Sequence, residues 1–156
     1  KLASSMGAEV TMLSRSPEKQ KDATALGATH FALTTDKEAM KQISSSFDLI
    51  IDTVSAVHDY NDYLALLKTN GVMVLLGIPP KAVAVQASRL VSRRRSLAGS
   101  LVGGIKETQE MLDFCGTHGI TSDIEMIQIQ KINEAYERML KGDVKYRFVI
   151  DMASLK

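Results

Sequence analysis

Short apolar runs alternate with amphipathic segments along the chain. A run of β-branched and apolar residues between glycine, proline or polar turns predicts a strand, whereas apolar residues three or four positions apart predict a helix. The predicted strands cover residues 8–13, 30–33, 47–52, 71–77, 96–102, 123–129 and 146–151. The predicted helices cover residues 17–26, 37–43, 60–68, 86–94, 105–118 and 132–140.

Residues suited to helix ends stand where several of these helices begin and stop. Ser16 precedes Pro17, so we expect Ser16 to be the N-cap and Pro17 the first helical residue. Asp36 is expected to cap the next helix. Gly27 and Gly119 are expected to end the helices before them, because glycine readily adopts the left-handed conformation of a helix C-terminus.

The alternation of strands and helices predicts an α/β fold with a parallel sheet. Residues 47–52 form a nearly continuous apolar run, which is typical of a strand buried on both faces. Right-handed crossovers then favour a doubly wound, Rossmann-like sheet. We see no repeat and no linker, so residues 1–151 are expected to form one dinucleotide-binding domain and residues 152–156 a tail that leaves it.

The expected beginning of such a domain has no match in the sequence. A dinucleotide fold opens with a strand, a glycine-rich turn and a helix, but there is no G-x-G-x-x-G here. Residues 1–6 instead resemble the end of a helix stopped by Gly7. We therefore expect an incomplete domain whose first strand and glycine-rich loop lie upstream. That strand is central in the order 3-2-1-4-5-6, so strands 8–13 and 30–33 should lack a partner joining them to strands 47–52 and 71–77.

Composition narrows the classes of function. The 156 residues are 45% hydrophobic and 24% charged, which is ordinary for a globular protein. A formal net charge of +1 gives no reason to expect nucleic acid or an anionic membrane as partner. No apolar run approaches the length of a membrane span. The single cysteine, Cys115, excludes an internal disulfide and fits a reducing compartment, so a cytoplasmic location is expected.

The residues that follow the strand predicted at 8–13 carry the most informative chemistry. Ser14, Arg15 and Ser16 follow the strand at 8–13, and Lys19 stands one helical turn later. An acidic residue at this place would bind the ribose 2′-hydroxyl of NAD and repel a 2′-phosphate. Two hydroxyls, a guanidinium and an ammonium at a helix N-terminus suit a phosphate, which favours NADP. The alternative is that the serines are turn and cap residues and the cations are solvated.

Three runs of the sequence resemble a known family. They are residues 47–54, residues 99–115 and residues 132–151. They are similar to the cinnamyl-alcohol-dehydrogenase branch of the zinc-containing medium-chain alcohol dehydrogenases, and the similarity to bacterial NADPH-dependent aldehyde reductases of that branch is especially close. The resemblance covers essentially the whole chain.

The resemblance implies a set of cofactor-binding positions. Those that match the 2′-phosphate site are Ser14, Arg15, Ser16 and Lys19. Those that match positions beside the ribose and nicotinamide are Thr53 and Val54, and those whose backbone groups hold the carboxamide are Ile78, Ser100 and Val102. Leu101 matches a position that lines the substrate pocket, and Arg147 one that reaches the pyrophosphate.

The resemblance also implies a function for the whole enzyme. The whole enzyme is expected to be an NADP(H)-dependent zinc alcohol dehydrogenase or aldehyde reductase that interconverts primary alcohols and aldehydes. Members of the family are usually homodimers, with the subunit interface near residues 96–102. The family's zinc ligands and acid–base groups belong upstream, so this segment is expected to contain no catalytic residue and no metal ligand, and to be inactive alone. Its partners are a small alcohol or aldehyde, without nucleic acid or membrane.

Other patterns in the sequence are weaker. His30, His58 and His118 are far apart, and Cys115 with His118 supplies only two ligands of the four in a structural zinc site. Cys115 is therefore expected to be a buried structural thiol. Residues 93–95 are three consecutive arginines without interleaved aromatic residues, which is typical of a solvated helix end rather than a nucleic-acid site.

Two alternative functions stay open. One is a zinc-free quinone or enoyl reductase of the same superfamily, which the residues upstream would distinguish. The other is a non-catalytic nucleotide-binding or assembly module made of this segment alone, against which the absent glycine-rich loop argues.

Overall fold

The computed structural model describes residues 1–155, which form two compact units. Unit 1 comprises residues 1–109, and unit 2 comprises the described residues from 110 onward. Every strand pair within the described residues is parallel, which confirms the predicted α/β class with parallel strands. Among residues 1–155, no helix is long and apolar enough to span a membrane.

Unit 1 contains two separate parallel sheets. β1 pairs with β2, and β3, β4 and β5 form a second sheet in that order. Within the described part of the chain no strand joins β1 to β3, as the sequence predicts. The elements of unit 1 are α1 (Leu2–Ser5), β1 (Thr11–Ser14), the 3-10 helix η1 (Pro17–Lys19), α2 (Gln20–Ala25), β2 (His30–Leu33), α3 (Lys37–Gln42), β3 (Phe47–Asp52), α4 (Tyr60–Leu64), β4 (Leu67–Leu75), α5 (Ala87–Val91) and β5 (Ser96–Gly99).

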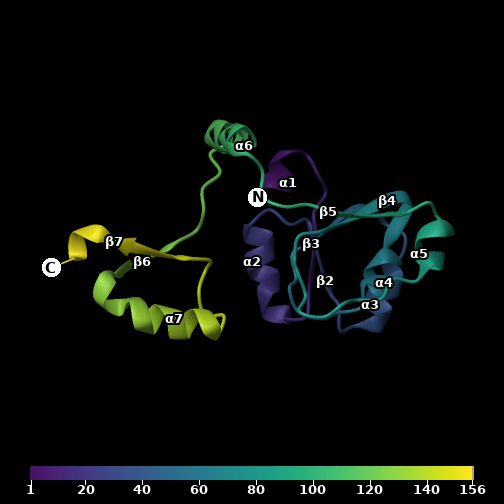
Figure 1. Cartoon of the computed structure of the whole chain (residues 1–156), viewed down its shortest axis with the longest axis horizontal. Coiled ribbons are helices and arrows are strands. Elements are labelled where there is room, and N and C mark those ends of the chain that lie inside the picture. Colours follow the sequence, from purple (N-terminus) through teal and green to yellow (C-terminus); the bar gives the residue numbers. More distant parts are fainter. Residues whose placement is uncertain (156) are drawn as a thin grey trace. The chain divides into compact units, whose positions relative to one another are not determined.

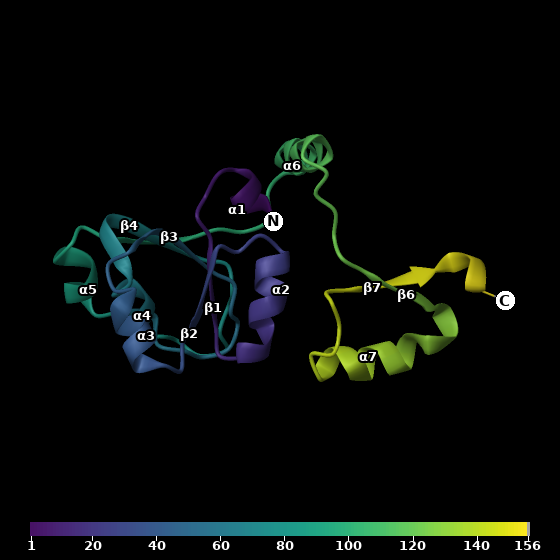
Figure 2. The same cartoon turned by 180° about the vertical axis from the view of Figure 1, so that it is seen from behind.

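Helices lie on both sides of these strands. In Figure 1, α3, α4 and α5 gather on one side of unit 1 and α2 lies on the other, and Figure 2 gives the same arrangement from behind. The main core is formed between β3, β4 and α4 by apolar side chains that water does not reach. Its members are Ile50, Tyr60, Leu64, Leu66, Leu67 and Met73. Burial of these side chains fixes the sheet against the α3–α5 layer.

One expectation for β3 is wrong. Ile50 and Asp52 are buried, but Leu49 and Ile51 are 54% and 56% exposed. Successive side chains of a strand point to opposite faces, so the apolar run has one buried face and one open face here. A continuous apolar run therefore predicted the strand correctly without showing that both of its faces are covered.

The boundary between α4 and β4 also differs from the prediction. The helix ends at Leu64 rather than at Lys68, and β4 starts at Leu67 rather than at Gly71. Asn70 has φ +64°, and the pairing of β4 with β3 shifts register between Phe47 and Leu49. The polar residues 68–70 thus belong to an irregular strand start, which the apolar pattern alone does not reveal.

The predicted helix ends are mostly confirmed. The carboxylate of Asp36 accepts hydrogen bonds from the backbone N–H groups of Glu38 and Ala39 at 2.9 and 3.1 Å, as an N-cap does. Gly27 and Gly119 have φ values of +99° and +62° after their helices. Ser16 differs, because its side chain makes no capping hydrogen bond to η1.

Arg95 is not part of a solvated helix end. It is only 8% exposed, although the run 93–95 was expected to be solvated. Its Nε donates to the carbonyl of Leu67 at 2.9 Å, and its Nη atoms reach the carbonyls of Ala65 and Arg89 at 3.3 Å. Burial, and secondarily the charges of Arg93 and Arg89, lower the pKa of Arg95. The guanidinium joins the end of α4, the start of β4 and α5.

Unit 2 is a small β-α-β arrangement. Helix α6 (Ile105–Thr117) begins in unit 1 and ends in unit 2. It is followed by β6 (Glu125–Gln128), η2 (Ile129–Lys131), α7 (Ile132–Leu140), β7 (Phe148–Asp151) and η3 (Met152–Ser154). Strands β6 and β7 are shorter than predicted, whereas α7 has its predicted bounds. Cys115 on α6 is partly exposed rather than buried.

Arg138 connects the elements of unit 2. Its guanidinium bonds Glu125 on β6 and Asp143 after α7, both at 2.8 Å, and lies 4.9 Å from the ring centre of Phe148 on β7. Asp143 and Glu125 raise the pKa of Arg138. Its guanidinium in turn lowers the pKa of each carboxyl group, and the N–H of Lys145 adds to the effect on Glu125.

Candidate functional site

The carboxyl ends of β3, β4 and β5 form one edge. Asp52, Leu75 and Gly99 are register partners across the three parallel strands. The next residues of the chain continue this edge, since the N–H of Ser100 donates to Leu75 at 3.1 Å and the N–H of Gly77 donates to Asp52 at 3.1 Å. The predicted residues follow these neighbouring strand ends: Thr53 and Val54 come after β3, Ile78 after β4, and Ser100, Leu101 and Val102 after β5.

A buried carboxylate organises the loop after β3. One oxygen of Asp52 accepts the N–H of Val54 at 3.0 Å, and the other lies 2.8 Å from Nε2 of His58. The second ring nitrogen of His58 lies 2.7 Å from the carbonyl of Ala56. Asp52 and His58 are 8% and 16% exposed. The loop 53–57 is thus fastened to the end of β3 at its beginning, middle and end.

Gly77 allows this loop to pack directly on the loop after β4. A Cβ atom at Gly77 would lie 2.4 Å from the carbonyl carbon and oxygen of Val54. Those are backbone atoms that cannot rotate away, so only a residue without a side chain fits here.

The residues predicted to bind the 2′-phosphate of the cofactor lie at the end of β1. Ser14 is the last residue of the strand, and its Oγ accepts the N–H of Ser16 at 3.1 Å. Arg15 is exposed, and Lys19 is the exposed last residue of η1. In this turn no acidic residue stands between the strand and η1. The donor set suits a phosphate rather than a sugar hydroxyl.

Tyr63 on α4 connects the two groups of predicted residues. Burial raises the pKa of Tyr63, and the nearby carboxylates of Asp52 and Asp62 add to the rise. The side chain of Thr34, which follows β2, and the charge of Arg15 act in the opposite direction. Groups at the ends of β1, β2 and β3 thus all influence the pKa of the Tyr63 hydroxyl.

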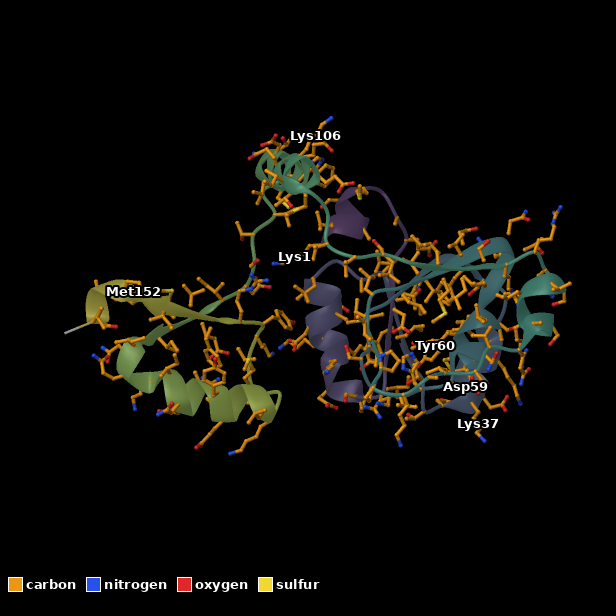
Figure 3. The ribbon with its side chains drawn as sticks, viewed as in Figure 1. Lys1, Lys37, Asp59, Tyr60, Lys106 and Met152 are labelled. Carbon is orange, nitrogen blue, oxygen red and sulfur yellow. The ribbon has the colours of Figure 1, made fainter. Side chains whose placement is uncertain are left out.

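The ring of His58 lies between two tyrosines. Tyr60 and Tyr63 meet it edge-on, with ring centres 5.1 and 5.4 Å away. Figure 3 shows Tyr60 pointing into the body of unit 1, in contrast to Lys37, which points away from it. These contacts fix the plane of the imidazole.

Several predicted positions are not brought into contact with the others. Leu101 and Val102 lie beyond β5 with exposed side chains. Arg147 lies in unit 2 just before β7, and its expected role at the pyrophosphate stays a prediction.

Three residues of this edge were not found from the sequence. Asp52 was treated only as the end of a strand, His58 only as a rejected metal ligand, and Tyr63 not at all. An acidic residue that ends a buried strand is an unusual combination, because a buried carboxylate needs partners. That observation would have directed attention to a donor a few residues later.

The zinc expected for the whole enzyme finds no ligand set here. Within residues 1–155, no three histidine, cysteine, aspartate or glutamate side chains lie close enough together to hold a metal ion. The residues of this chain therefore do not fit a zinc site, and no step at zinc is assigned to them.

Known proteins resemble this chain along its whole length. NADP-dependent alcohol dehydrogenase C 1 of Mycolicibacterium smegmatis is 53% identical over 156 residues, which are 100% of this chain and 45% of that protein. Aldehyde reductase YahK of Escherichia coli is 50% identical over 99% of this chain and 45% of its own length. A cinnamyl alcohol dehydrogenase of Sorghum bicolor superimposes with a TM-score of 0.93 and 43% identity over 100% of this chain and 44% of its own.

These similarities confirm the Rossmann-like class and the resemblance inferred from the sequence. The chain spans slightly less than half the length of these proteins. Residues 1–117 match the family described as zinc-binding dehydrogenase. The chain therefore belongs to the zinc-binding dehydrogenase family and corresponds to its nucleotide-binding portion.

Proposed function

We propose that this chain is the cofactor-binding portion of an NADP(H)-dependent zinc alcohol dehydrogenase or aldehyde reductase that interconverts primary alcohols and aldehydes. The observation that carries the proposal is the end of β1, where Ser14, Arg15 and Ser16 stand without an acidic residue. A carboxylate there would repel the 2′-phosphate, whereas hydroxyl and guanidinium donors bind it. The two bacterial relatives with NADP-dependent alcohol dehydrogenase and aldehyde reductase names support the same reading.

Each group of residues has a proposed role. The 2′-phosphate is held by Ser14, Arg15, Ser16 and Lys19. Thr53 and Val54 border the ribose and nicotinamide, backbone groups of Ile78, Ser100 and Val102 hold the carboxamide, and Leu101 lines the substrate pocket. Bound NADPH supplies the hydride that reduces a carbonyl carbon. The chain's own contribution is to bind the cofactor and orient its nicotinamide.

The proposal extends to the assembly and setting of the whole protein. Zinc would be held by residues outside this segment, and the protein would act on a small alcohol or aldehyde in the cytoplasm. A homodimer is supported by β5, which pairs only with β4 within the described residues. Exposed apolar residues, among them Leu101 and Ile105, follow that free edge, and such patches mark contact surfaces.

Cofactor preference tests the proposal most directly. NADPH and NADH are titrated separately into the full-length protein that carries this chain, and binding is followed by the fluorescence of the reduced nicotinamide. We expect selective binding of NADPH. Ser14→Asp should weaken NADPH binding by about a hundredfold or more, since a like charge at the phosphate costs several kcal/mol, and should change NADH binding little.

Two lysines provide the matched comparison. Lys19→Ala should weaken NADPH binding, whereas Lys21→Ala, which removes an exposed lysine two residues later on α2, should not. Equal affinity for NADPH and NADH in the unmodified protein, or a Ser14→Asp variant that keeps its NADPH affinity, would overturn the proposal.

A further inference from the structure

The loop 53–57 is ordered without a core of its own. Its side chains are exposed, including the apolar ones of Val54 and Val57. Exposed side chains do not fix a loop by packing, so its conformation depends on its backbone hydrogen bonds. The hydrogen bonds that hold it converge on Asp52 and His58.

His58 is suited to this task because it bonds on two sides. Its Nδ1 lies 2.7 Å from the carbonyl of Ala56 and its Nε2 lies 2.8 Å from the carboxylate of Asp52. Both partners are acceptors, so the imidazole bridges them with two hydrogen bonds only when both of its ring nitrogens, which point in diverging directions, carry a proton and donate. A glutamine of similar reach has its two donors on one nitrogen and cannot bridge both oxygens in the same way.

Asp52 completes the connection from the other side. Its second carboxylate oxygen accepts a hydrogen bond from the N–H of Val54 at 3.0 Å. Its backbone carbonyl accepts hydrogen bonds from the N–H groups of Leu76 at 2.8 Å and Gly77 at 3.1 Å. One residue thus joins the loops after β3 and β4. Since Asp52 is 8% exposed, water competes little for these hydrogen bonds.

We propose that the Asp52–His58 pair is the positioning device that holds the loop 53–57, and with it Thr53 and Val54, in the conformation that receives the cofactor. The inference rests on the proposed function only for the identity of the ligand, NADP(H). Both residues are positioning residues, because they act through the backbone of the loop. Tyr60 and Tyr63 support them by fixing the imidazole ring edge-on.

Two variants of the full-length protein test the pair, each with a matched control. Asp52→Asn keeps the shape and an acceptor for Val54 but removes the charge, and His58→Gln removes the bridge. Asp48→Asn is the first control, because Asp48 lies on the same strand but is 82% exposed in a pair with Lys68. His30→Gln is the second, because His30 is exposed and paired with Glu9.

The expected result is a local loosening with weaker cofactor binding. Amide hydrogen exchange of the peptide that covers residues 53–58 should speed up in both variants and in neither control, while exchange in β4 should stay unchanged. The dissociation constant for NADPH should rise by about tenfold, the loss expected from one charge-assisted hydrogen bond. The double variant should lose less affinity than the sum of the two single losses, because both variants weaken the same Asp52–His58 hydrogen bond.

The outcomes separate this inference from the proposed function. A full-length protein that does not bind NADPH would defeat the proposed function, and hydrogen exchange alone would then decide the role of the pair. Exchange and NADPH affinity equal to those of the controls would overturn the inference. Loss of the folded state in both variants would also overturn it, since the pair would then hold the core rather than the loop.

Discussion

Arg95 in unit 1 and Arg138 in unit 2 both connect segments of the chain, but they do so through different partners. Each guanidinium joins three segments of the chain. Arg95 is 8% exposed and donates to backbone carbonyls, whereas Arg138 is 34% exposed and bonds two carboxylates. Burial lowers the pKa of Arg95, and the carboxylate partners raise the pKa of Arg138.

The difference shows what each arginine contributes. Arg95 contributes hydrogen-bond donors, but its charge is destabilising where it lies. The desolvated cation has no neutralising partner among the described residues. Arg138 acts as a charge that attracts Glu125 and Asp143. Stability that depends on Arg95 should therefore be insensitive to salt and mild acid, and stability that depends on Arg138 should respond to both.

The largest effect is expected at Arg95. Arg95→Met keeps an unbranched side chain but removes the donors to the buried carbonyl of Leu67, whereas the carbonyl of Ala65 keeps hydrogen bonds from Ser45 and Ser44. We expect unit 1 to lose about 2 kcal/mol of unfolding free energy, because a buried acceptor that loses its donor costs about 1–3 kcal/mol. The loss of stability is measured by urea unfolding, with amide hydrogen exchange of β4 as the readout. A variant as stable as the unmodified protein would show that the carbonyls do not need the guanidinium.

A smaller and pH-dependent effect is expected for Arg138→Gln. Arg138 lowers the pKa of Glu125 and of Asp143, so the folded state gains stability from the two ionised carboxylates. A carboxyl group with a depressed folded pKa stabilises fully above its unfolded value, which is about 4, and loses that contribution as the pH falls through the lower folded value.

The difference between the two proteins should therefore be largest at neutral pH and shrink as the pH falls through the lowered pKa values of Glu125 and Asp143. Thermal unfolding of unit 2, recorded at about pH 7 and at about pH 3, measures the change. High salt should also reduce the difference at neutral pH, because these groups are partly exposed. A constant difference at both pH values would mean that contact with Phe148, rather than charge, dominates.

The smallest effect is expected for Arg93→Gln. Arg93 is exposed, and its charge helps lower the pKa of the buried Arg95. Removal of a like charge should be slightly stabilising, by no more than about 0.5 kcal/mol, which is the usual range for surface substitutions. Chemical denaturation at low and high salt tests this. A clear loss of stability would contradict the contrast between the two neighbouring arginines.

Local rules predicted the parts of the fold that depend on few neighbours. The cap at Asp36, the glycine ends and the bounds of α7 follow from residue type and apolar spacing alone. The start of β4 did not, because the irregularity at Asn70 depends on pairing with β3. The burial of Arg95 was also missed, since three consecutive arginines look alike until the chain brings the carbonyls of residues 65 and 67 beside one of them.

The candidate site divides in the same way. The residues at the end of β1 could be proposed from the sequence because a cation replaces an acid at a known place after a strand. The Asp52–His58 pair was not found, because it requires the loop 53–57 to fold back on the strand it leaves. The register of Asp52, Leu75 and Gly99 explains why residues after three different strands share one edge.

The close approach at Gly77 sets a limit on protein engineering at the edge formed by the ends of β3, β4 and β5. A saturation library at position 77 should return glycine almost alone among folded clones, since every other residue would push the neighbouring loop by its main chain. Position 78, one residue later, carries the largely exposed Ile78 and should accept wide variation. Attempts to redesign the proposed nicotinamide end of the site have freedom in the side chains that surround this point of contact, and none at the point itself.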